Sequence, residues 1–252
     1  MFVLSKNFPF FRRLKVKISG ENNRISPFFS EMGGGGGLHA KTRIKICGNE
    51  NAISIGENCL GRFNLMVFGD NNTIKFEDSV LFNGLSIYIG SPDYPCNNSK
   101  VYIGSGTTFS GPGTFRLMEH NSEIILGNDV MFSEHFDVWC SDTHAILDER
   151  GNAKNVGKSI KIGAHVWVGK DVKIGKNVEI PGGCVVGWGS VVSRKFSEKN
   201  AVIAGNPARV VKVGVHWVRE TISQITPPPP PINFNFIDLI NSFVKFSYAK
   251  TC

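Results

Sequence analysis

The stretch IGAHVWVGKDVKIGKNVEIPGGCVVGWGSVV, residues 162–192, decides the fold. Every sixth residue in it is isoleucine or valine, and glycine or proline follows each of the first five. The anchors are Ile162, Val168, Ile174, Ile180, Val186 and Val192. A period of six is neither the 3.6 of a helix nor the 2 of a single strand. It predicts a triangular solenoid in which each hexad is one short strand plus a corner, and three hexads complete one coil.

The sequence before this stretch repeats more loosely. Ile103, Phe109 and Phe115 keep the six-residue spacing, and so do Leu126, Phe132 and Val138. A second theme places isoleucine five residues after glycine, with Asn or Asp between them. It occurs at 20–25, 48–53 and 69–74. Asn and Gly tolerate left-handed corners, so these segments are interpreted as irregular coils.

These patterns divide the chain into three parts. Residues 1–100 are predicted to form irregular N-terminal coils with a glycine-rich insertion at 33–37, and residues 101–213 a regular β-helix. Residues 214–252 are predicted to form a C-terminal cap, in which residues 215–225 are a short helix, a polyproline spacer at 227–231 and a tail. Residues 204–212 read as a terminating strand. The fold class is therefore all-β, with a short helical region near the C-terminus.

The repeat breaks in one place. Counting by sixes from Val138 reaches His144, Arg150 and Val156 before Ile162 resumes the pattern. Histidine and arginine are poor fillers for the interior of a prism. Residues 143–158 are therefore predicted to form a loop extruded from the solenoid, with His144 at its root.

Composition excludes several classes of protein. Glycine accounts for 28 of 252 residues, charged residues for 19% and hydrophobic residues for 41%. These values exclude a disordered chain and a coiled coil, and so much glycine disfavours a helical bundle. No apolar run approaches the ~20 residues of a membrane span, and residues 1–17 do not read as a secretory signal. Six cysteines without a Cys-x-x-Cys pair favour a reducing cytoplasm over a disulfide framework or a zinc site.

The net charge of +7 is concentrated in one segment. Residues 154–212 hold eleven Lys or Arg and three Asp or Glu. A concentrated positive surface favours an anionic partner such as nucleic acid, phospholipid or a polyphosphate cofactor. Stacking aromatics are not interleaved with these basic residues, which argues against nucleic acid.

The hexads of 162–192, the ending at 204–212 and the Ser-Asp-Thr-His-Ala-Ile of 141–146 resemble the hexapeptide-repeat acyltransferases. Residues 101–220 are especially similar to bacterial polysaccharide O-acetyltransferases, including those of capsular polysialic acid. The resemblance implies a left-handed parallel β-helix and a homotrimer. It also implies acetyl-CoA between adjacent prisms as co-substrate, a glycan acceptor and no metal.

The resemblance also implies roles for individual residues. His144 matches the catalytic base, and Trp167 the aromatic residue beside the pantetheine and thioester. Trp188 stands where the family has alanine. The matched cofactor-binding residues are Trp167, Gly169, Lys170, Gly187, Trp188, Ser193, Arg194, Lys195 and Arg209. From their position near His144, and not from the resemblance, Arg116, Glu119 and Asp142 are the candidate acceptor-binding residues.

A histidine suits this chemistry because an alcohol needs a base to attack a thioester at neutral pH. The unperturbed pKa of histidine, ~6.5, lies close to the working pH. Asp142, Glu134 or a backbone carbonyl is expected to orient the imidazole. The phosphates of CoA would also account for the basic segment.

Three other functions compete with this hypothesis. An N-acetyltransferase of an amino sugar nucleotide would share the fold and the cofactor. A γ-type carbonic anhydrase would need three zinc-ligating histidines, and no two of the six histidines have the spacing of that family. A non-catalytic β-helix scaffold would not bind CoA.

Overall fold

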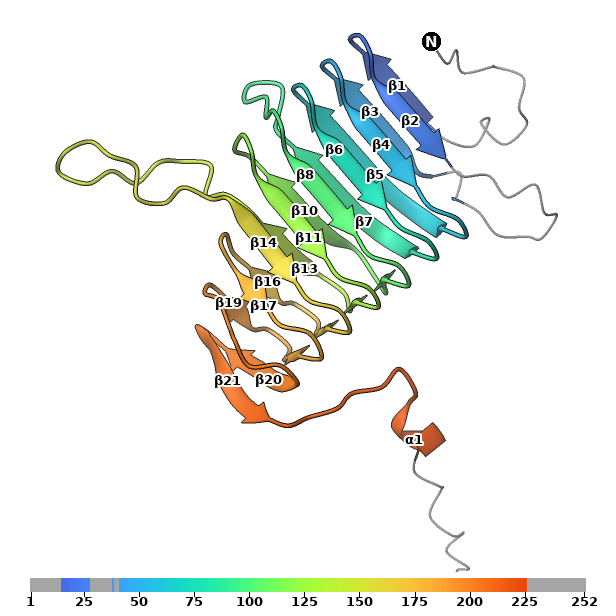
Figure 1. Ribbon diagram of the computed structural model, residues 1–252, viewed down its shortest axis with the longest axis vertical. Helices are drawn as coiled ribbons and strands as arrows, with labels where there is room; N and C mark the ends of the chain where they lie inside the picture. Colours follow the sequence, from blue (N-terminus) through green and yellow to red (C-terminus); the bar gives the residue numbers. More distant parts are fainter. Residues whose placement is uncertain (1–14, 28–37, 39–40, 226–252) are drawn as a thin grey trace, which may run out of the picture. The chain divides into compact units, whose positions relative to one another are not determined.

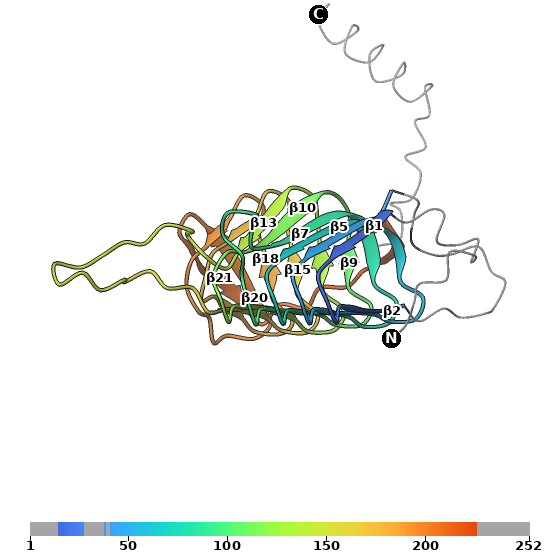
Figure 2. The same cartoon turned by 90° about the horizontal axis from the view of Figure 1, so that it is seen from above.

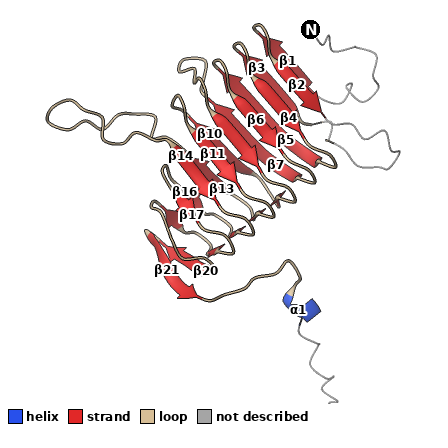
Figure 3. Ribbon diagram, viewed as in Figure 1, coloured by secondary structure: helices blue, strands red, loops and turns tan. Residues whose placement is uncertain are grey.

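Strands account for nearly all of the regular structure (Figure 3). The computed structural model describes residues 15–27, 38 and 41–225. The chain divides into two units, one ending at Trp217 and one beginning at Val218. In the first unit, short strands joined by tight corners stack as successive coils (Figure 1). The predicted all-β solenoid is confirmed.

Each coil has three sides, called faces A, B and C. Face A holds β9 (Thr108–Phe109), β12 (Met131–Phe132), β15 (Trp167–Val168), β18 (Val185–Val186) and β20 (Ala201–Gly205). Face B holds β1 (Lys15–Ser19), β3 (Arg43–Cys47), β10 (Gly113–Leu117), β13 (Phe136–Trp139), β16 (Lys173–Ile174) and β19 (Val191–Val192). Face C holds β2 (Arg24–Pro27), β4 (Ala52–Ile55), β6 (Thr73–Phe76), β8 (Lys100–Ile103), β11 (Glu123–Leu126), β14 (Ser159–Ile162) and β17 (Glu179–Ile180). The long strands β5 (Leu60–Phe68) and β7 (Leu81–Ile89) bend across the corner from face A to face B.

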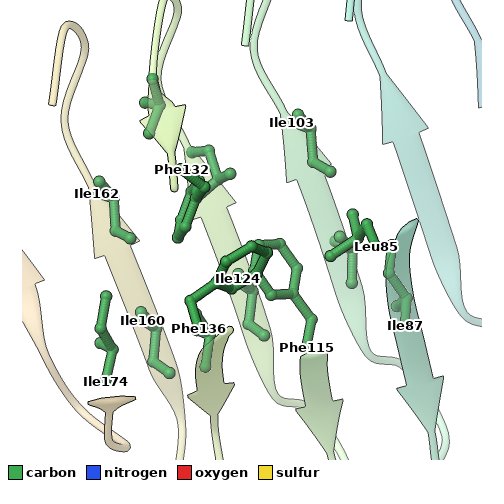
Figure 4. Close-up of a cluster of buried hydrophobic side chains, with 14 of the residues drawn as sticks. Leu85, Ile87, Ile103, Phe115, Ile124, Phe132, Phe136, Ile160, Ile162 and Ile174 are labelled. Atoms are coloured by element: carbon green, nitrogen blue, oxygen red, sulfur yellow. The ribbon is translucent and has the colours of Figure 1, made fainter. Parts of the chain in front are cut away.

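The register confirms the six-residue frame. Ile162 pairs with Ile180 on face C, Val168 with Val186 on face A, and Ile174 with Val192 on face B, all in parallel. All six anchors are buried, so the interior is a column of stacked aliphatic rows. In the middle coils this column is aromatic: the ring centroids of Phe132 and Phe136 lie 4.6 Å apart (Figure 4), and Phe109 stacks on Phe132 with centroids 5.2 Å apart.

The irregular N-terminal coils follow the same design with longer corners. Gly48 has φ +144°, and a Cβ there would lie 2.0 Å from the carbonyl oxygen of Gly69 in the next coil, so only glycine fits. Asn51 and Asn72 are fully buried at this corner, where each side chain bonds to the coil above and below. The Gly-Asn-Ile theme thus builds a ladder of amides that satisfies the buried backbone groups of the corner.

The C-terminal end of the β-helix differs from the sequence interpretation. Residues 204–212 were expected to form one terminating strand, but they belong to an antiparallel pair, β20 and β21 (Ala208–Val213). The reversal falls at Asn206-Pro207, because proline cannot donate a ladder hydrogen bond. The expected helix over 215–225 is also shorter, since only Ile222–Ile225 (α1) is helical.

Several predicted segments cannot be compared with the structure. The glycine insertion at 33–37, the polyproline spacer at 227–231 and the tail at 232–252 lie outside the described residues. Within the described part of the chain, no helix is long and apolar enough to cross a membrane. The three-part division of the chain remains a prediction.

Candidate functional site

The predicted loop leaves the β-helix between β13 and β14, at the corner of faces B and C. It projects well beyond the coils in both views (Figures 1 and 2). Leu126 and Ile162 are register partners although the whole loop lies between them. The loop is therefore an insertion that leaves the stacking of the coils undisturbed, as the break in the hexads predicted.

A single carboxylate ties the two ends of the loop together. Glu119 lies at the same corner one coil earlier. It accepts a hydrogen bond from the Ser141 hydroxyl at 2.6 Å and another from the Gly157 amide at 2.9 Å. Gly157 must be glycine, because a Cβ would lie 2.0 Å from the Cys140 carbonyl oxygen. The candidate acceptor residue Glu119 therefore closes the root of the loop.

The next coil also holds the loop. The Asn177 side chain accepts a hydrogen bond from the Lys158 amide and donates one to the Val156 carbonyl, each at 2.9 Å. Lys176 forms an ion pair with Asp142. The hydrogen bond from Lys176, together with a second one from Asn155, holds the pKa of the Asp142 carboxyl below its ordinary value of 3.8.

His144 is exposed at the start of the loop and its backbone is fixed. Its amide donates to the Asp142 carbonyl, and its own carbonyl accepts from the Asn155 side chain, each at 2.8 Å. Thr143, immediately before it, has φ +67°, a left-handed conformation that is rare for a β-branched residue. Such strain is typical of functional sites. The two carboxylates that were expected to orient the imidazole have other partners in the described structure. Asp142 bonds to Asn155 and Lys176, and Glu134 pairs with Lys170 at a different corner.

Arg116 lies on the outer side of face B, one coil before the loop. Its guanidinium carbon is 5.0 Å from the centroid of the Tyr88 ring and 4.8 Å from that of the Trp139 ring. Trp139 is 41% exposed and stands two residues before Ser141. Cys140, between them, is buried, and this burial raises the pKa of its thiol to about 12, so it is not a nucleophile.

A second group of candidate residues lies on face A and the A–B corner. Trp167 faces outward on β15, and its indole nitrogen donates to the Ser133 hydroxyl at 3.3 Å. Trp188 is 75% exposed and covers Gly169, where a Cβ would be 2.6 Å from its ring. Gly187, of the same corner, lies against Ala204, which pairs with Arg209. Lys170, next to Gly169, forms an exposed ion pair with Glu134 at 3.6 Å.

Ser193, Arg194 and Lys195 lie elsewhere, at the B–C corner after β19. All three are exposed. The Arg194 guanidinium stacks on the Phe196 ring at 5.2 Å, and Lys195 is 3.8 Å from Glu179. They therefore share a corner with the loop, two coils further on.

The candidate residues thus form two groups, which lie on opposite sides of the three-sided β-helix. The B–C corner, with an adjoining residue of face B, carries Arg116, Glu119, Asp142, His144, Ser193, Arg194 and Lys195. Face A and the A–B corner carry Trp167, Gly169, Lys170, Gly187, Trp188 and Arg209. One chain does not bring His144 and Trp167 together, since a B–C corner faces away from face A.

Sequence reasoning missed the residues that hold the loop, namely Ser141, Asn155, Lys176 and Asn177. It also missed the contact of His165 with Trp217. These rings stack with centroids 4.2 Å apart, and the imidazole is 2.6 Å from the Asp129 carboxylate. The repeat itself contained a signal for Asn177, because Asn at a corner adopts the left-handed conformation, here φ +59°. Among the described residues, no three His, Cys, Asp or Glu side chains gather as metal ligands.

These features define a hexapeptide-repeat β-helix with a histidine-bearing loop at one corner. No protein-family model matches the chain. A polysialic acid O-acetyltransferase of Neisseria meningitidis is 34% identical to it over 123 residues. That match covers 48% of this chain, and the chain spans only 54% of the length of this curated relative.

Two solved structures match over most of the chain. The polySia-specific acetyltransferase NeuO is 26% identical with a TM-score of 0.68, and the match covers 83% of this chain and 91% of NeuO. The polysialic acid O-acetyltransferase OatWY is 27% identical with a TM-score of 0.60, and the match covers 86% of this chain and 98% of OatWY. The resemblance to hexapeptide-repeat acetyltransferases is confirmed, and the fold class is the predicted left-handed parallel β-helix.

Proposed function

We propose that this protein is an acetyl-CoA-dependent O-acetyltransferase that acetylates a hydroxyl of an anionic glycan such as a sialic acid polymer. The observation that carries the proposal is the match along most of the chain to two polysialic acid acetyltransferases. The anchored loop also supports the proposal, because it presents His144 as a base for the acceptor hydroxyl. We place the reaction in the cytoplasm and the product in a capsule or lipopolysaccharide.

His144 acts as the general base in this proposal. It takes the proton of the acceptor hydroxyl as the oxygen attacks the thioester carbonyl of acetyl-CoA, which forms the new C–O bond. The imidazolium then gives that proton to the sulfur as the C–S bond breaks, so that the ester and free CoA leave. The reaction needs neither a metal nor a covalent enzyme intermediate. Lys170 and Arg209 supply positive charge near Trp167 for an anionic cosubstrate.

We further propose that the protein is a homotrimer with each site shared between two copies. His144 and Trp167 lie on opposite sides of one chain, so a site that uses both needs a neighbour. The outward row of face A supports this proposal because it is mainly apolar. It consists of Leu60, Leu81, Thr108, Met131, Trp167, Val185 and Val202. An apolar surface of this kind favours burial against a partner.

Acetyl transfer to an amino sugar nucleotide is the alternative, since it would share the fold and cosubstrate. Release of CoA thiol from acetyl-CoA distinguishes the two, measured with a sialic acid polymer, neutral polysaccharides and amino sugar nucleotides as acceptors. The proposal expects turnover with the sialic acid polymer and an ester that mild base hydrolyses. Turnover only with the nucleotide, giving an alkali-stable amide, would replace it.

A further inference from the structure

Face B collects basic side chains that are far apart in the sequence. Its outward positions on β1, β3, β5, β7 and β10 form two parallel rows. One row is Lys15, Arg43, Asn64, Ser86 and Thr114, and the other is Lys17, Lys45, Met66, Tyr88 and Arg116. Five of these ten side chains are cationic and none is a carboxylate. This surface lies outside the basic segment at 154–212.

The A–B corner extends the same surface. Lys41, Arg43 and Arg62 line a shallow groove of about 300 Å³, together with Asn64, Gly84 and Pro112. The groove contains no acidic residue. We call Lys15, Lys17, Lys41, Arg43, Lys45, Arg62 and Arg116 the basic tract.

Four cations of the basic tract have no carboxylate partner in the described part of the chain. Among the described residues, Arg43, Lys45, Arg62 and Arg116 form no ion pair within 4.0 Å. Face C provides the contrast. There Lys75 pairs with Glu77 at 2.6 Å and Lys161 with Glu123 at 3.4 Å. Uncompensated charge on one face attracts a polyanion, whereas paired charge does not.

The basic tract ends beside the loop. Arg116 is held between the rings of Tyr88 and Trp139, and its Nε atom is buried without a hydrogen-bond partner among the described residues. Trp139 exposes part of its ring directly before the loop root. An aromatic face next to a guanidinium offers packing for a sugar ring and hydrogen bonds for its carboxylate.

We propose that face B is the binding surface for the acceptor, and that the acceptor is a carboxylate-bearing polysaccharide lying along the basic tract toward His144. This inference rests on the proposed function and adds the surface that selects a polymer. Four strand spacings separate β1 from β10, where the basic tract ends, a distance of ~19 Å. A surface of this length contacts several sugars at once, so affinity should increase with the length of the chain.

A charge-matched pair of variants tests this inference. The tract variant is Arg43→Gln, Lys45→Gln and Arg62→Gln. The control variant removes three cations from face C by Lys75→Gln, Lys100→Gln and Lys161→Gln. Equilibrium binding of a fluorescent polysialic acid of ~20 sugars is measured without acetyl-CoA, at about 50 and about 200 mM salt. A labelled sialic acid disaccharide is measured alongside.

We expect the tract variant to bind the polymer ~tenfold or more weakly, with a shallower salt dependence, because three charge-assisted contacts are lost. The control variant should bind like the wild type. In turnover, the KM for the polymer should rise while the KM for acetyl-CoA stays unchanged. The disaccharide, which cannot span the tract, should bind both variants equally.

Equal loss of polymer binding in the two variants would overturn the inference, since it would mean that only net charge matters. So would RNA of matched charge binding as tightly as the polysaccharide, because the surface would then be a nucleic-acid site. The binding assay is independent of catalysis. If the tract binds the polymer and no acetyl transfer occurs, the proposed function is wrong and the binding surface stands. If acetyl transfer occurs and the tract variant binds the polymer normally, the binding surface is wrong and the proposed function stands.

Discussion

At the scale of single residues, the root of the loop concentrates backbone strain and hydrogen bonds around one imidazole. Thr143 holds a left-handed backbone conformation that costs a β-branched residue ~1–3 kcal/mol. Ser141, whose hydroxyl accepts from the Thr143 amide at 2.9 Å, stabilises that conformation. The strain fixes the direction in which the chain leaves the corner, and so fixes the starting point of the His144 side chain.

His144→Ala should fold normally, retain acetyl-CoA binding and lose transfer by ~10²–10⁴-fold, the usual effect of removing a general base. Steady-state turnover and calorimetric binding of acetyl-CoA measure the two effects. The matched control is His135→Ala, an exposed histidine at the A–B corner whose nearest carboxylate, on Asp171, is 3.6 Å away. A folded His144→Ala protein that turns over like the control would remove His144 from the mechanism.

Glu119→Ala should open the root of the loop. It removes the acceptor of the Gly157 amide and of the Ser141 hydroxyl, and a polar group left without a partner costs ~1–3 kcal/mol. Glu119→Gln keeps one acceptor oxygen and should lose less. The measurement is hydrogen exchange at the Gly157 amide, with thermal unfolding alongside. Unchanged protection of this amide in the alanine variant would show that Glu119 does not close the loop.

At the scale of elements, the loop and the corner that carries it are joined by side chains from three successive coils. Glu119 comes from the coil before the loop, Asp142 from the loop root, and Lys176 with Asn177 from the coil after it. The loop therefore has a defined base, and its far end projects beyond the coils (Figure 1).

The ion pair between Asp142 and Lys176 should make this base sensitive to acid. The pKa of Asp142 is lowered in the folded state, first by its hydrogen bond from Lys176. Its contribution is therefore complete above the ordinary value of 3.8 and is lost as the pH falls through the lower folded value. An NMR titration of the Asp142 carboxyl carbon should give a midpoint below 3.8, and Lys176→Met should move it upward. Lys173→Met, which removes the partner of Asp137 instead, should leave the midpoint unchanged.

The elements also explain how far the sequence could predict the structure. The hexads of 162–192 and the position of the loop were predictable, because an inward side chain must be apolar and His144 and Arg150 are not. The early coils were harder to predict because their corners vary in length. Ile55 pairs with Phe76, which lies 21 residues later, whereas Phe76 pairs with Ile103, which lies 27 residues later.

The basic tract could not be predicted in the same way. Its residues are scattered between positions 15 and 116, and only the register of face B and the groove at the A–B corner bring them together. The separation of His144 from Trp167 was hidden for the same reason. Both depend on the face or corner of the coil that each residue occupies, which spacing in the sequence does not give.

At the scale of the whole molecule, the proposed shared site can be tested by mixing two inactive variants. His144→Ala and Trp167→Ala chains, co-expressed as a mixed trimer, should recover activity, because each mixed trimer contains one interface with both native residues. Random 1:1 mixing restores about a quarter of the sites in a cyclic trimer. Both pure variants should stay low. Activity in the mixture that merely equals their average would show that each site lies within one chain.

The reversal of the chain after β20 has a consequence for how these molecules coexist at high concentration. A solenoid that ended on a bare parallel strand would present unsatisfied backbone groups, on which the first strand of another molecule could continue the coil. Here β21, the last strand in the described part of the chain, runs antiparallel to β20. The register of the pair shifts between Val202 and Ile203, and Lys212 stands opposite Val202. Reversed direction, a bulge and a charged side chain each oppose the growth of a fibre from that end. The hairpin that closes the parallel coils therefore also protects this end of the β-helix against end-to-end polymerisation.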